Sequence, residues 1–338
     1  MHNSDKPILV EIFAGRGTLS RAMVQAGFSV LSVDHENNGA VVPLMMLDLT
    51  SSSGVKVLWD ILSSPNVAAV HLGLPCGTAS LARERPVAKN LVLQGAPNPP
   101  PLRSASKPLG LDGLSPFHQA KVDSANKLYA LAIQILVFCV RRNIAFSIEN
   151  PANSWLWAAL VLLSAQHSPE AAMAYNSLEK VVFHACCHGS SRRKSTAWLG
   201  TKGVFSSLAA SCQGDHDHAP WGARWTGNSW MFDTASEAAY PVLLSQRVAA
   251  CLVKVVLSRG LSLQPVLRLH DLATAAQGKQ SKKHHPLIPE FHRVTTRPKG
   301  EQLPEGTKLL PPHLGGVLRE EEKLNKANEV TAGGSCSV

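Results

Sequence analysis

Residues 7–34 read PILVEIFAGRGTLSRAMVQAGFSVLSVD. The run 7–13 is apolar and rich in β-branched residues, and a glycine turn ends it, which predicts a buried strand. Thr18 can cap a helix that runs to about residue 26, where Gly27 stops it. The opening of the chain therefore predicts a strand, a glycine turn and a helix in close succession.

A second strand follows at once, over 29–33, and it ends at Asp34. Strand, glycine turn, helix, strand and acid together are typical of the first half of a nucleotide-binding α/β sheet. We therefore expect a Rossmann-like α/β fold, with a mostly parallel sheet and helices on both faces.

Further elements are predicted along the chain by the same patterns. Strands are expected over 68–72, 144–148 and 180–185, helices over 124–141 and 241–258, and a long Pro-rich loop over 86–117. The most apolar part of the predicted helix 124–141 is residues 128–140. It is too short to span a bilayer and is followed by Arg141 and Arg142, so no membrane segment is expected.

The chain divides into a predicted domain, 1–260, and a flexible, charged and basic tail, 265–338. Within the domain, 186–230 is dense in Cys, His and Arg. The formal net charge is +9, which favours a polyanionic partner, although much of the excess lies in the tail segment 278–300. Seven cysteines without a secretory signal favour reduced thiols and an intracellular, nuclear or cytoplasmic protein that is not secreted.

The turn Phe13-Ala14-Gly15-Arg16-Gly17 predicts a cofactor site. Gly15 and Gly17 permit backbone angles closed to other residues and let a ligand approach the main chain. The turn is not the six-residue dinucleotide fingerprint, so a phosphate-bearing cofactor is less favoured. Asp34 is placed to accept hydrogen bonds from two ribose hydroxyls, and Asp48 to hold an adenine amine.

Cys76 is the candidate nucleophile, because Pro75-Cys76 lies in the loop after a strand, where open α/β sheets place their ligands. Most free cysteines are core residues, but small polar neighbours and the cations Arg83 and Arg85 favour a reactive thiolate here. Glu149 ends the strand 144–148, where a carboxyl group is costly unless it has a partner or a task. A cysteine nucleophile with a glutamate proton donor fits this pair.

The ordered motifs resemble those of the cytosine-5 DNA methyltransferase family. Phe-x-Gly-x-Gly near the start, Pro-Cys after a later strand and Glu-Asn after the next carry most of the resemblance. The segment 188–194 resembles that family's arginine-bearing motif, and 227–229 with the helix after Pro241 resembles its closing motif. The match covers roughly residues 8–258.

The resemblance implies S-adenosylmethionine as cofactor and cytosine C5 as the methyl acceptor. Cys76 would add to C6 of a flipped-out cytosine, Glu149 would hydrogen-bond or protonate N3, and Arg192 or Arg193 would orient the base or its phosphate. The residues implied at the cofactor are Phe13, Gly15, Gly17, Asp34, Asp48, Pro75 and Asn228.

Three departures from the family pattern limit the resemblance. Gly77 replaces the usual glutamine, the loop between Cys76 and Glu149 is long, and 195–226 is too short for a separate target-recognition domain. DNA is favoured over RNA as the partner, and a protein partner could supply specificity. The alternatives are an RNA cytosine methyltransferase, an inactive nucleic-acid-binding module of the same fold, and a small-molecule methyltransferase, which leaves the Pro-Cys and Glu-Asn pair unexplained.

A metal site is the last candidate. Cys187, Cys212, His216 and His218 could supply four soft ligands for zinc, with the two histidines on one side of an extended segment. The spacing is not that of a recognised zinc finger, and a histidine-rich turn beside buried thiols is the alternative. If zinc binds, we expect a structural staple.

Overall fold

β1 (Ile8–Ile12) is an inner strand of a seven-stranded sheet in the computed structural model, which describes residues 6–263. It pairs in parallel with β2 (Ser29–Asp34) on one side and with β4 (Val67–Leu72) on the other. Helices cover both faces of the sheet, so both faces of the strand are buried and its sequence is apolar on both sides, apart from the buried Glu11.

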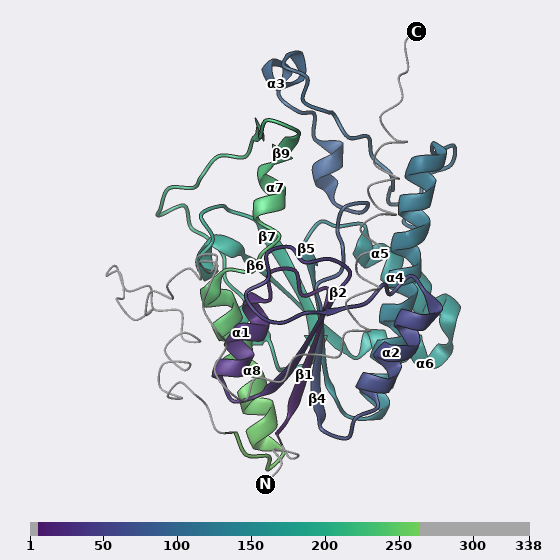
Figure 1. Cartoon of the computed structure of the whole chain (residues 1–338), viewed down its shortest axis with the longest axis vertical. Helices are drawn as coiled ribbons and strands as arrows, with labels where there is room; N and C mark the ends of the chain where they lie inside the picture. Colours follow the sequence, from purple (N-terminus) through teal and green to yellow (C-terminus); the bar gives the residue numbers. More distant parts are fainter. Residues whose placement is uncertain (1–5, 264–338) are drawn as a thin grey trace, which may run out of the picture. The chain divides into compact units, whose positions relative to one another are not determined.

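The sheet has the strand order β3-β2-β1-β4-β5-β7-β6, as Figure 1 shows in part. The remaining strands are β3 (Met45–Met46), β5 (Ala145–Pro151), β6 (Leu178–His184) and β7 (Ser195–Thr201). Only β7 runs against the others, because β5 and β6 each pair with it in antiparallel fashion. The predicted Rossmann-like α/β class, with a mostly parallel sheet, is confirmed.

The strand order reverses between β1 and β4. From β1 the chain moves outward to β2 and β3, then crosses back to β4 on the other side of β1. In open α/β sheets ligands bind at the carboxyl ends of the strands where the order reverses in this way. The glycine turn after β1 and the Cys76 loop after β4 flank this point.

Two helical layers bury the sheet (Figure 1). One core is formed with α1 (Thr18–Gln25) and α8 (Val242–Ser258), which pack against each other. The opposite core is formed with α2 (Ser52–Leu62), α4 (Pro116–Arg141), α5 (Leu156–His167) and α6 (Pro169–Asn176). Helices on both faces were predicted, although α2, α5, α6 and β7 were not.

The start of α1 differs from the prediction. Gly17, in the left-handed conformation, is the residue that caps the helix, and no side chain accepts a capping hydrogen bond. The Thr18 hydroxyl instead donates to the Tyr240 carbonyl oxygen, 3.0 Å away. Thr18 therefore joins the first helix to the segment before α8, and the predicted role as a cap is wrong.

α4 is longer than predicted. It begins at Pro116, capped by the Ser115 hydroxyl, rather than at residue 124. At 26 residues it is the one helix within 6–263 that is long and apolar enough to cross a membrane by length and composition. Its apolar side chains form part of the core beside the sheet, which accounts for its composition.

The segment 86–117 is not wholly irregular, because it contains the short helix α3 (Lys89–Leu93) and the start of α4. Farther along, β8 (Ala223–Trp225) and β9 (Trp230–Phe232) form a separate hairpin, followed by α7 (Asp233–Ser236). Figure 1 shows α3 and β9 at the same end of the domain. The predicted tail, 265–338, lies outside the described residues.

Candidate active site

The glycine turn after β1 is built around the Asp34 carboxylate. The Gly15 amide donates to Asp34 Oδ2 at 2.7 Å, and the His35 amide and ring donate to Oδ1. Phe13, Gly15 and Gly17 all have positive φ, so the chain folds back on itself between strand and helix. A Cβ on Gly17 would lie 2.4 Å from the Val42 side chain, which requires glycine there.

The predicted cofactor residues lie at several places around this edge. A side chain built on Gly15 would meet nothing within 4 Å, so the turn is open on one side. Asp34 already accepts three hydrogen bonds, and because a carboxylate has about four acceptor positions, about one remains for a ribose hydroxyl. Asp48 is exposed, and one of its oxygens accepts from the Thr50 amide and hydroxyl.

Two other predicted cofactor residues are placed less directly. Pro75 precedes Cys76 and is exposed, and its carbonyl oxygen accepts from the Tyr129 hydroxyl at 3.1 Å. Asn228 lies in the exposed turn of the β8–β9 hairpin, outside the main sheet. Within 6–263, Asn228 makes no hydrogen bond to the glycine turn; the contact from this part of the chain comes from Tyr240.

Cys76 and Glu149 are brought together by neighbouring strands. Leu72 of β4 pairs with Ile148 of β5, and Glu149 is the next residue along β5. The Asn150 amide donates to the Leu74 carbonyl oxygen at 2.8 Å, which fixes the chain just before Cys76. Burial is the main cause that raises the pKa of the Cys76 thiol, and the negative charge of Glu149 adds to it.

Lys194, which sequence reasoning did not select, joins this pair. Its ammonium lies 3.6 Å from Glu149 Oε1, and its charge lowers the pKa of the Cys76 thiol. Lys194 directly precedes β7, whose antiparallel pairing with β5 brings it to the carboxyl end of β5. The site therefore combines a thiol, a carboxyl group and a cation.

The predicted activation of Cys76 by Arg83 and Arg85 is wrong. Burial raises the pKa of the thiol above its ordinary value, and Lys194 only partly opposes this effect. The Arg83 guanidinium donates instead to the carbonyl oxygens of Pro100 and Gly77, so it ties the Cys76 loop to the Pro-rich segment. The resting thiol is therefore protonated and becomes nucleophilic only when a partner accepts its proton.

A chain of hydrogen bonds connects Glu149 to Tyr240, His71 and Ser147. The Tyr240 hydroxyl donates to Glu149 Oε2 at 3.3 Å and lies 2.9 Å from His71 Nε2, while His71 Nδ1 lies 2.9 Å from the Ser147 hydroxyl. Burial lowers the pKa of His71 to about 3, so the ring is neutral. Because Tyr240 donates to Glu149, its oxygen accepts from His71 Nε2–H, and Ser147 donates to Nδ1.

The acceptor Glu149 Oε1 is left without a hydrogen-bond donor among the described residues. Glu149 is 8% exposed, so Oε1 is a buried carboxylate oxygen, and its closest charged partner is the Lys194 ammonium 3.6 Å away. An unsatisfied buried acceptor is costly and needs an explanation. A ligand that donates a hydrogen bond at this point would provide one.

The Pro-rich segment 86–117, which lies between Cys76 and Glu149, is anchored by Arg103, which is 1% exposed. Its guanidinium donates to the Thr78 hydroxyl, to the Pro108 carbonyl oxygen and to Asn126 Oδ1. Thr78 belongs to the Cys76 loop and Asn126 to α4. The long loop is therefore clamped onto the site, although its sequence predicted only an irregular segment.

The arginines selected from the sequence lie differently. Arg192 forms ion pairs with Glu237 at 3.1 Å and Asp233 at 3.3 Å, and its side chain is 15% exposed. Arg193 is exposed. Lys194, rather than either arginine, is the residue that meets Glu149, so a catalytic role for Arg192 or Arg193 stays a prediction.

A Cys/His group that could hold a metal ion lies beside this segment. It consists of Cys186, Cys212, His216 and His218, whose ligand atoms all lie within 4.8 Å of one another. Cys186 thus takes the place predicted for Cys187, since the 3₁₀ helix η2 (Ala185–His188) directs the Cys186 sulfur to the group. The other three predicted ligands are brought together.

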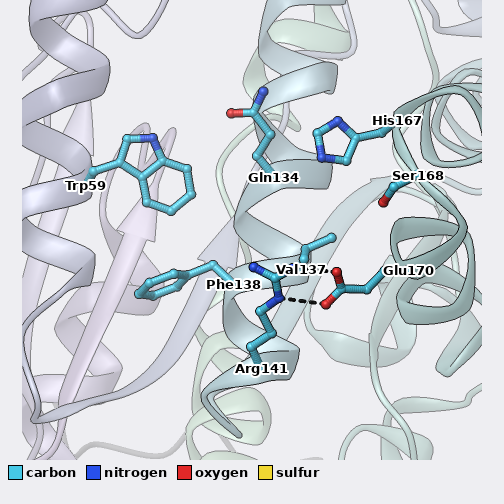
Figure 2. A pocket seen from close by; sticks show the side chains of 8 residues that line it. All are labelled: Trp59, Gln134, Val137, Phe138, Arg141, His167, Ser168 and Glu170. Atoms are coloured by element: carbon cyan, nitrogen blue, oxygen red, sulfur yellow. Dashed lines mark hydrogen bonds and ion pairs between the residues drawn. The ribbon is translucent and has the colours of Figure 1, made fainter.

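A pocket of about 400 Å³ lies elsewhere, on the outer surface near α4 (Figure 2). Its lining comes from α2, α4 and the α5–α6 junction, and the Arg141–Glu170 ion pair lies in it. None of the residues described above lines it. This hollow is therefore separate from the Cys76 site.

No protein-family model and no curated protein matches the sequence. Among solved structures, the chain is similar to the methyltransferase EhMeth of Entamoeba histolytica, with 12% sequence identity and a TM-score of 0.36. The similarity covers 58% of this chain and 52% of that one, so about half of the EhMeth chain is spanned.

Proposed function

We propose that this chain is an S-adenosylmethionine-dependent methyltransferase that acts on C5 of cytosine in DNA through a covalent bond to Cys76. The proposal depends above all on the meeting of Cys76, Glu149 and Lys194 beside the glycine turn. A sulfur nucleophile, a carboxyl group and a cation at the ligand-binding edge of an α/β sheet are suited to nucleophilic addition with charge stabilisation.

The unsatisfied Glu149 Oε1 supports a cytosine ring as the substrate. The exocyclic amine of cytosine, and N3 when protonated, are hydrogen-bond donors on one edge of the ring. A base flipped out of the helix would bring this edge to Glu149 while its C6 faces the sulfur. A glutamate that binds the edge more strongly as charge develops there stabilises the transition state more than the ground state.

The residues would act in sequence. The Cys76 sulfur forms a bond to C6 and its proton leaves to a base, while Glu149 protonates or hydrogen-bonds N3 so that electron density moves to C5. S-adenosylmethionine, when bound, supplies an electrophilic methyl group to that carbon. Loss of the C5 proton to a base then allows the Cys76–C6 bond to break, which restores the aromatic ring and releases the Cys76 thiolate; the base that took the thiol proton returns it to the sulfur. Lys194 would stabilise the thiolate during both sulfur steps.

The cofactor would be held by the open turn at Gly15 and by the acids beyond β2 and β3. Asp34 retains about one acceptor position for a ribose hydroxyl, and the second oxygen of Asp48 is open to an adenine amine, which fits a nucleoside cofactor. Zinc at the Cys186 group would be structural, because four protein ligands leave no open coordination position.

The nucleic-acid partner is supported by charge and by the β8–β9 hairpin. Trp225 is 56% exposed and lies next to Arg224, which offers a base-stacking surface and a phosphate contact. Trp230 of the hairpin lies near Gly95, so the hairpin and the α3 loop are neighbours. Together these segments could bind the strand from which the base is flipped.

Labelled methyl transfer tests the proposal. The full chain is incubated with methyl-tritiated S-adenosylmethionine and with duplex DNA, single-stranded DNA or RNA, and the labelled base is identified after digestion. We expect 5-methylcytosine in DNA, its loss in Cys76→Ser, and its retention in the matched variant Cys187→Ser. Label on RNA alone would show that the substrate is RNA rather than DNA. Label on an atom other than cytosine C5, methyl transfer by Cys76→Ser, or no transfer to any of the nucleic acids would contradict the proposal.

A further inference from the structure

The Cys186, Cys212, His216 and His218 group has its four ligand atoms within 4.8 Å of one another, close enough to share one metal ion. The Cys212 sulfur lies 3.5 Å from His218 Nε2 and 3.9 Å from His216 Nε2. Around zinc, with its usual bond lengths, a sulfur and an imidazole nitrogen are about 3.6 Å apart. Both distances agree with that spacing within a few tenths of an ångström, and two sulfurs with two nitrogens are a preferred donor set for zinc.

The surroundings of the ligands also resemble those of a metal site. The other ring nitrogen of His216, Nδ1, lies 2.9 Å from Asp215 Oδ1, so the carboxylate would orient the ring with Nε2 toward the ion. The Gly214 amide donates to the Cys212 sulfur at 3.3 Å. Both sulfurs are buried, with Cys186 4% and Cys212 7% exposed, which protects a structural ion from exchange.

The loop that carries three of these ligands has little structure of its own. Residues 211–221 contain no helix or strand, and the positive φ of Gly214 turns the chain so that both histidines face Cys212. Beyond the ligands, the Ala219 amide donates to the Ser191 carbonyl oxygen at 2.8 Å and Arg192 donates to the Pro220 carbonyl oxygen. The loop therefore packs along the segment that ends at Lys194.

We propose that Cys186, Cys212, His216 and His218 bind one zinc ion, which fastens the 211–221 loop to the β6–β7 connection and thereby positions Lys194 at Glu149. The ion joins η2 to the loop, and the loop in turn holds Ser191 by a main-chain hydrogen bond and Arg192 through its side chain, just before Lys194. Zinc binding at this site does not depend on the proposed reaction, so either can fail alone.

Metal content of the purified full chain is the first test. We expect about one zinc per chain by atomic emission, as for a closed structural site. Cys212→Ser and His218→Ala should lose the metal, while Cys187→Ser, whose sulfur is outside the group, should keep it. Zinc that is absent from the wild type, or lost equally from Cys187→Ser, would overturn the proposal.

Cobalt substitution of the wild type keeps the test decisive if a variant fails to fold. Zinc is removed with a chelator and replaced by Co²⁺, and the visible spectrum should show tetrahedral coordination with thiolate-to-cobalt charge transfer. Hydrogen exchange on the same sample should show that 191–194 and 211–219 lose protection without metal and that β1 does not. A spectrum of octahedral cobalt would contradict the proposed metal site. Equal hydrogen exchange with and without metal would contradict the proposal that the ion fastens the 211–221 loop.

Discussion

Removal of the Tyr240 hydroxyl tests the hydrogen-bond chain beneath Glu149. Tyr240→Phe keeps the ring and its contacts with His71 and Trp198, whose centroids lie 5.6 and 5.8 Å away. It deletes the donor to Glu149 Oε2 and the acceptor for His71 Nε2, and His71 is 1% exposed. Each of the two buried groups left unpaired costs about 1–3 kcal/mol, so we expect a loss of about 2–6 kcal/mol in the free energy of unfolding.

Urea unfolding of Tyr240→Phe and of Tyr175→Phe measures this effect against a matched control. Tyr175 is half-buried, and its hydroxyl makes no hydrogen bond within the described residues, so its removal should change stability by less than about 0.5 kcal/mol. If the two variants lose the same amount, or if Tyr240→Phe is neutral, the Ser147–His71–Tyr240–Glu149 chain is not a stabilising network.

Three further predictions concern the elements around the site. Burial raises the pKa of Glu11 from 4.5 to about 7, so the folded state holds this proton more tightly than the unfolded state. As the pH rises from 4.5 to 7, the wild type should therefore lose about 3 kcal/mol of stability relative to Glu11→Gln. Urea unfolding of both proteins across this pH range measures the difference. A Cβ on Gly73 would lie 2.9 Å from the Phe13 carbonyl oxygen, whereas a Cβ on Gly77 would meet nothing within 4 Å. Gly73→Ala should therefore lower the free energy of unfolding by about 1–3 kcal/mol, and Gly77→Ala should change it little. Equal shifts of the melting temperature in the two variants would contradict this packing. Arg103→Lys keeps the charge but loses hydrogen bonds to Thr78, Pro108 and Asn126. It should lower the free energy of unfolding by about 2–3 kcal/mol and speed proteolysis within 86–115. An unchanged cleavage rate would show that Arg103 does not anchor this loop.

Local sequence was enough to predict the first strand, its glycine turn and the loop after β4. Strand ends and turns depend on residue types a few positions apart, and Asp34 and Cys76 each directly follow such a pattern. Cys76 and Glu149 could also be paired in advance, since the carboxyl ends of parallel strands share an edge. β4 and β5 do pair in parallel, and the roles of Cys76 and Glu149 stay a prediction.

Lys194 and Tyr240 were missed for a different reason. Lys194 meets Glu149 only because β7 pairs antiparallel with β5, and β7 was not predicted. Tyr240 acts through His71 and Glu149, far away in the sequence. One signal was present: His71 is the single polar residue in the otherwise apolar strand 67–72, and such a histidine needs a buried partner.

The choice between Cys186 and Cys187 also lay beyond the sequence. The two thiols are adjacent, so no pattern of residue types distinguishes them. A single 3₁₀ turn, η2, determines which sulfur faces Cys212. In the same way, the long loop 86–117 gave no sign of its anchoring, because the burial of Arg103 depends on partners in the Cys76 loop and in α4.

The most direct test of the central claim is covalent trapping of the protein on a 5-fluorocytosine oligonucleotide. Fluorine at C5 blocks the loss of the proton that would release the sulfur, so the bond between Cys76 and C6 should persist. With S-adenosylmethionine present, we expect a denaturation-resistant adduct on a gel and a modified Cys76 peptide by mass spectrometry. A wild type that binds the oligonucleotide without forming an adduct, or a Cys76→Ser variant that still forms one, would contradict the account.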